Sequence, residues 1–87
     1  MLEVDIHDPR GQIPVTFTYV GKEVKGTLTF VVGAAAYRWD LNVKGFHWGE
    51  LHLQEQQGKY VWRFFAPKYD LSHLADFFGD VVRSWYE

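Results

Sequence analysis

The sequence contains no cysteine, which excludes two common ways of stabilising a small chain. Neither a disulfide nor a thiolate-bound metal ion can form without this residue. Its absence agrees with the reducing interior of a cell, and we expect a cytoplasmic location. No run of about 18 apolar residues occurs either, so we expect no membrane-spanning helix and no membrane partner. The first eight residues, MLEVDIHD, alternate and are acidic, unlike a secretory signal peptide.

Nucleophilic side chains are also scarce. The only serines are Ser72 and Ser84, and Ser72 directly precedes His73 in a predicted helix, where adjacent positions do not face each other. The spacing Gly45-x-x-x-Gly49 lacks the Lys-Ser/Thr pair that would make it a phosphate-binding loop. We therefore expect no enzymatic activity, no catalytic residues and no cofactor.

Metal ligands are too few in the predicted arrangement. His47, Glu50 and His52 come closest to a cluster. On a regular strand Glu50 and His52 share a face and His47 points the other way, which leaves two ligands where a site needs at least three. A third ligand could come only from His7, His73 or an acidic residue that the fold brings close. The sequence therefore predicts polar groups on a solvated strand, and no metal.

Aromatic residues are what the sequence has in abundance: 4 Trp, 5 Tyr and 7 Phe in 87 residues. Eight of these aromatics lie between Tyr37 and Phe65. Each large aromatic side chain buries about 150–250 Å², so a chain this short can build its core from them. We treat residues 1–87 as a single domain, near the small end of what folds alone.

Six segments alternate between apolar and polar residues with period 2, as half-buried strands do. We predict strands at about residues 2–7, 13–20, 23–32, 36–44, 46–55 and 59–66. Gly21-Lys22 fits a type II′ hairpin loop, Lys44-Gly45 a second tight turn, and Gln56-Gln57-Gly58 a third. Residues 70–86 have apolar positions at helical spacing, with Asp70 as the expected N-cap.

Short turns between successive strands leave no helical crossover for parallel pairing. The sequence thus predicts an α+β fold: an antiparallel meander of five or six strands, strongly bent or half-barrel in shape, covered on its concave face by one C-terminal amphipathic helix. This layout is similar to pleckstrin-homology-like rolls and to coactivator-type single-stranded-DNA binders. It is a likeness of arrangement, without a shared sequence motif, and it assigns no function.

Aromatic side chains outnumber the inward positions of one sheet face, and Phe46, Trp48 and Phe65 have no obvious place in the interior. Side chains of a strand alternate between its two faces. Counted from the inward residues Leu51 and Leu53, Trp48 falls on the polar face, unless a bulge at Gly49 turns it inward. We expect Trp48 to point outward.

Exposed aromatics and arginines are the residues that concentrate binding energy at interfaces. The sequence therefore favours a small, non-enzymatic protein-binding module, such as an adaptor, an inhibitor or an accessory subunit. The predicted partner site consists of Phe46, Trp48 and Phe65, rimmed by Arg38 and Arg63. The same patch could form a homodimer.

A single-stranded nucleic-acid-binding protein is the alternative. Several cations share the outward parity of the predicted strands, and phosphate contacts with stacked bases are how single strands are bound. Asp40 and Glu50 lie on that face too, however, and the net charge is −2.

Overall fold

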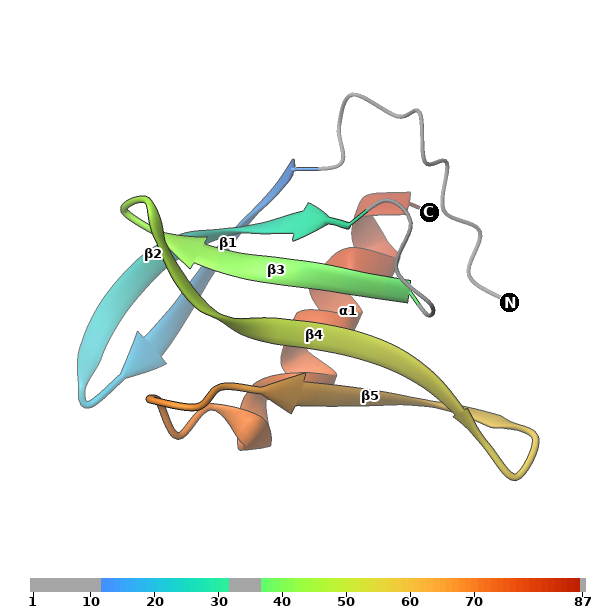
Figure 1. Cartoon of the computed structure of the whole chain (residues 1–87). Coiled ribbons are helices and arrows are strands. Elements are labelled where there is room, and N and C mark those ends of the chain that lie inside the picture. The colour runs from blue at the N-terminus through green and yellow to red at the C-terminus, as the bar shows by residue number, and fades with distance from the viewer. Residues whose placement is uncertain (1–11, 32–36, 87) are drawn as a thin grey trace.

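The computed structural model describes residues 12–31 and 37–86 (Figure 1). The strand predicted at 2–7 and the end residues 32 and 36 of two other predicted strands lie outside the described residues. Within them the elements are β1 (Gln12–Tyr19), β2 (Lys22–Phe30), β3 (Tyr37–Val43), β4 (Phe46–Gln56), β5 (Lys59–Phe65), a 3₁₀ turn η1 (Ser72–Leu74) and α1 (Ala75–Tyr86).

The strands form one antiparallel sheet in chain order, β1-β2-β3-β4-β5, which curls into a half-barrel. α1 packs against β1, β4 and β5, so it touches both edge strands of the curled sheet (Figure 1). We call the side of the sheet that α1 covers the inner face and the opposite side the outer face. The predicted fold class, an antiparallel meander with a C-terminal helix, is confirmed.

Alternating side chains build the core on the inner face. In β1 the apolar residues Ile13, Val15 and Phe17 are buried, and the residues between them are exposed. Trp39 of β3 and Phe78 of α1 are the largest fully buried side chains in the described part of the chain. Aromatic residues thus fill the centre of this small core, as their abundance suggests.

Three two-residue turns join the strands, and each ends in glycine. Val20-Gly21, Lys44-Gly45 and Gln57-Gly58 all have positive φ at both positions, as type I′ turns require. The turn predicted at 44–45 is confirmed. The turn predicted at 56–58 is shorter by one residue, because Gln56 pairs with Lys59 and only Gln57-Gly58 forms the turn. The prediction of a II′ loop at Gly21-Lys22 is wrong by one residue, because Lys22 already pairs with Tyr19.

The helix begins differently from the prediction. Asp70 is not its N-cap: Leu71 precedes η1, without a side-chain capping bond, and α1 itself starts at Ala75. Leu71 is fully buried, and its carbonyl oxygen accepts a hydrogen bond of 2.9 Å from the Leu74 N–H. Burial of Leu71 therefore fixes the entry of the chain, and a tight 3₁₀ turn takes the place of the capped first turn.

Candidate functional site

The site predicted from the sequence depends on a bulge in β4. Leu41 pairs with Gly49, whereas the next residue of β3, Asn42, pairs with His47. Trp48 is the extra residue, so two residues of β4 oppose one position of β3. A Cβ on Gly49 would lie 2.7 Å from the Phe64 ring, and glycine is therefore the residue that lets β4 and β5 pack here.

Trp48 points to the inner face, and the expectation that it points outward is wrong. Its ring stacks on Tyr69 with centroids 4.0 Å apart and 4° between the planes. It also meets Phe17 and Tyr19 edge-on, at centroid distances of 6.0 and 5.6 Å. The bulge interrupts the alternation of side chains between Gly49 and Trp48. Counting alternate positions back from Leu51 therefore assigns Trp48 to the wrong face.

The other two predicted aromatics lie on opposite sides of the sheet. Phe46 pairs with Val43, whose buried side chain belongs to the inner face, yet Phe46 itself is 71% exposed. Phe65 pairs with Glu50 on the outer face and is 49% exposed. Phe46, Trp48 and Phe65 therefore do not form one patch, because the bulge separates the first two from the third.

Phe65 and the two predicted arginines do share the outer face. Arg38 pairs with His52, and His52 pairs with Arg63, so these three side chains form a row across β3, β4 and β5. The Phe65 ring meets the His52 ring edge-on at 5.0 Å. Arg63 is exposed and donates to Gln56 Oε1 at 3.3 Å.

Arg38 is held by acidic neighbours. Its Nε donates to Asp40 Oδ1 at 2.9 Å, and its Nη2 lies 3.3 Å from Glu50 Oε2. The hydrogen bond to Asp40 raises the pKa of Arg38 above its usual value. The guanidinium therefore stays charged, and two carboxylates compensate its charge, which leaves Arg63 as the better available cation for a partner.

The free edge of β5 is a second feature of this surface. Among the described residues β5 has a strand neighbour, β4, on one side only. Gln56 and Lys59 flank the two-residue turn as a hydrogen-bonded pair, so alternate residues of β5 bond to β4 from there. Tyr60, Trp62 and Phe64 consequently direct their N–H and C=O groups to the free edge.

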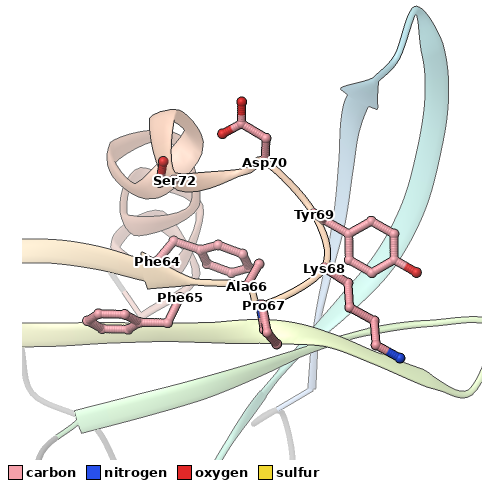
Figure 2. A pocket seen from close by; sticks show the side chains of 8 residues that line it. All are labelled: Phe64, Phe65, Ala66, Pro67, Lys68, Tyr69, Asp70 and Ser72. Carbon is pink, nitrogen blue, oxygen red and sulfur yellow. The ribbon is translucent and has the colours of Figure 1, made fainter.

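An open groove of about 690 Å³ lies at the end of β5, beside Phe65 (Figure 2). Figure 2 shows Phe65 on one side of the loop and Tyr69 and Lys68 on the other. The residues that line the groove are Phe64, Phe65, Ala66, Pro67, Lys68, Tyr69, Asp70 and Ser72. The lining combines apolar rings with one cation and one carboxylate.

Tyr60, at the start of β5, is 51% exposed and is not among the site residues predicted from the sequence. The missed signal is strand order: the last strand of a meander is an edge, so side chains at its start have a neighbour on one side only. The groove after β5 was missed as well, because it depends on how the loop folds back toward η1.

Comparison of the chain with protein-family models, curated proteins and solved structures finds no significant match. In the described part of the chain, no helix is long and apolar enough to cross a membrane.

Proposed function

We propose that this chain is a small, non-enzymatic protein-binding module that binds an extended segment of a partner protein along the free edge of β5. The observation that carries the proposal is Phe65, a half-exposed aromatic residue at the mouth of a groove, on a strand that has one strand neighbour among residues 12–31 and 37–86. An added strand satisfies edge peptide groups, and pockets beside the edge then select its side chains.

The exposed side chains of β5 suit that role on both faces. Tyr60 is exposed on the inner side of the edge, and Arg63 and Phe65 are exposed on the outer side. A strand added to this edge would place alternate side chains beside each of them. Tyrosine and arginine, with large aromatics generally, are the residue types that concentrate interface energy.

The alternative, binding of single-stranded nucleic acid, has less support. Phe65 is the one aromatic residue on the outer face of the described strands, since Phe46 and Trp48 lie on the inner side. Arg38 is compensated by two carboxylates. Stacking platforms and free cations are what such binding needs.

Selection from a random peptide library tests the proposal before any natural partner is known. For a selected peptide, Phe65→Ala should weaken binding by about 2 kcal/mol, or about 30-fold in Kd. Phe77→Ala is the matched control, because Phe77 is similarly exposed, at 43%, and lies on α1. Equal Kd values for the two variants would contradict the proposed site.

Proline substitution tests the use of the edge itself. Tyr60 directs its N–H away from β4, so Tyr60→Pro removes an edge donor and leaves the β4–β5 bonds in place. Tyr60→Pro should bind the selected peptide at least about tenfold more weakly than Tyr60→Ala does. This factor corresponds to the loss of one net hydrogen bond, about 1.4 kcal/mol. Identical affinities would mean that the peptide does not add to the sheet.

Two further measurements separate the remaining possibilities. Sedimentation of the wild-type chain distinguishes peptide capture from pairing of β5 with a second copy. Titration with a single-stranded oligonucleotide at rising salt tests the alternative function, since phosphate contacts make affinity fall steeply with salt. Tight, strongly salt-dependent oligonucleotide binding without any peptide binding would favour the alternative.

A further inference from the structure

The bulge in β4 brings a histidine to the outer face that a regular strand would turn away. His47 pairs with Asn42 and Glu50 pairs with Asp40, although His47 and Glu50 are an odd number of residues apart. The extra residue, Trp48, makes this possible. The reason for expecting no metal, that His47 lies on the other face from Glu50, therefore does not hold.

Four polar side chains consequently gather on the outer face of β3 and β4. His47 Nε2 lies 3.6 Å from Asp40 Oδ1, and His52 Nε2 lies 3.0 Å from Glu50 Oε1. The possible ligand atoms of Asp40, His47 and Glu50 all lie within 4.8 Å of one another. The side chains of Asp40, Glu50 and His52 are only 24%, 31% and 23% exposed, so the sheet restricts their positions.

We propose that Asp40, His47 and Glu50 bind Zn²⁺ or a similar first-row divalent cation, with His52 as a positioning residue for Glu50. One imidazole nitrogen and two carboxylate oxygens are ligands that Zn²⁺ accepts, and water completes a tetrahedral site. Mg²⁺ and Ca²⁺ are selected by oxygen ligands alone, so the imidazole favours the zinc type. The cation would join the two strands of the β3–β4 hairpin.

The geometry requires a small closure around the ion. Bonds of about 2.0–2.1 Å place tetrahedral ligands about 3.3 Å apart. The three ligand atoms now lie up to 4.8 Å apart. Side-chain rotations that move each atom by about 1 Å bring them to the tetrahedral separation. The His52–Glu50 hydrogen bond holds one of these ligands, as outer hydrogen-bond partners do in known sites.

Arg38 sets the affinity by competing for the carboxylates. It contacts both Asp40 and Glu50, so a cation must displace a guanidinium that already neutralises them. One substitution should therefore strengthen Zn²⁺ binding instead of weakening it. Arg38→Met keeps the aliphatic part of the side chain, removes the competing charge, and should tighten Zn²⁺ binding at least about tenfold.

Isothermal titration of the untagged, EDTA-treated full chain with ZnCl₂, and separately with MgCl₂, tests the site. We expect one Zn²⁺ per chain and negligible Mg²⁺ binding. His47→Ala should abolish binding in the measured range, and His52→Ala should weaken it by about 10–100-fold. The control is the double variant His7→Ala/His73→Ala, which alters the other two histidines of the sequence and should bind like wild type.

Circular dichroism of each variant establishes that it is folded, which His47→Ala should be, because its side chain is 47% exposed. The absence of Zn²⁺ binding by wild type up to about 1 mM would overturn the proposal. So would undiminished binding by folded His47→Ala, since the ion would then be held elsewhere. Weaker binding by Arg38→Met would show that the guanidinium does not compete for the site.

Discussion

Trp48 lies where β1, β4 and the loop after β5 meet, and its contacts are those of a core residue. It stacks on Tyr69 and meets Phe17 and Tyr19 edge-on. We expect Trp48→Ala to lower the free energy of unfolding by about 2–3 kcal/mol, because it removes a large, partly buried ring and its aromatic pairs. Urea unfolding measures this loss. Phe46→Ala, at a site 71% exposed, is the control and should change stability by no more than about 0.5 kcal/mol. If both variants changed the free energy of unfolding by similarly small amounts, Trp48 would be a surface residue.

Gly79 has a low helix propensity, but the packing at its position in α1 requires a residue without a side chain. Glycine costs about 1 kcal/mol relative to alanine in a helix interior. A Cβ at this position would overlap the Trp62 ring, which packs against the helix here. We expect Gly79→Ala to destabilise the chain by up to about 2 kcal/mol, because overpacking costs about 1–3 kcal/mol and the gain in helix propensity offsets only about 1 kcal/mol. Ser84→Ala, on the exposed side of the same helix, should be neutral or slightly stabilising. A rise in melting temperature for Gly79→Ala would show that Trp62 can move aside.

At the scale of elements, local patterns predict what local forces decide. Alternation places β1 to β5 within a few residues, and helical spacing identifies the stripe that packs on the sheet. The errors occur where tertiary contacts decide the local structure. The bulge at Trp48 depends on the Phe64 ring packing over Gly49, and the 3₁₀ start of the helix depends on buried Leu71. Neither contact can be read from neighbouring residues.

The same limit explains why the candidate site was predicted in part. Arg38, Arg63 and Phe65 lie on regular parts of their strands, so parity places them correctly on one face. Phe46 and Trp48 precede Gly49 in the bulged part of β4, so their faces depend on the bulge. Counting alternate positions predicts the face of a side chain only within a stretch of strand that contains no bulge.

The β1–β2 hairpin turn carries an unfavourable residue. Val20 has φ of 51° and is 81% exposed, although β-branched residues rarely adopt positive φ. Asparagine followed by glycine is a preferred type I′ pair, so Val20→Asn should raise the free energy of unfolding by about 1 kcal/mol. Lys44→Asn, at φ of 52° in the next hairpin turn, is the matched control and should gain less because lysine is unbranched. Thermal melts of both variants measure the difference. No gain for Val20→Asn would indicate that Val20 makes a compensating contact.

At the scale of the whole molecule, one side chain connects the two edges of the half-barrel. Phe78 of α1 is fully buried, and its ring lies 5.4 Å from Phe17 of β1 and 5.0 Å from Phe64 of β5. These strands are the two ends of the sheet order and are not neighbours within it. The helix therefore closes the curled sheet by packing between β1 and β5, which are not hydrogen-bonded to each other in the described part of the sheet.

Phe78→Ala should therefore cost about 3–5 kcal/mol, a large part of the stability of a domain of this size. The loss should also reach both edges at once, because the ring contacts both. Urea unfolding followed by tryptophan fluorescence gives the total, and native-state hydrogen exchange gives the amides of β1 and β5 separately. Phe77→Ala, one position away and 43% exposed, changes the same residue type outside the core and should leave exchange at both edges nearly unchanged. If Phe78→Ala accelerated exchange in β5 alone, α1 would stabilise one edge, and the half-barrel would remain curled without the helix.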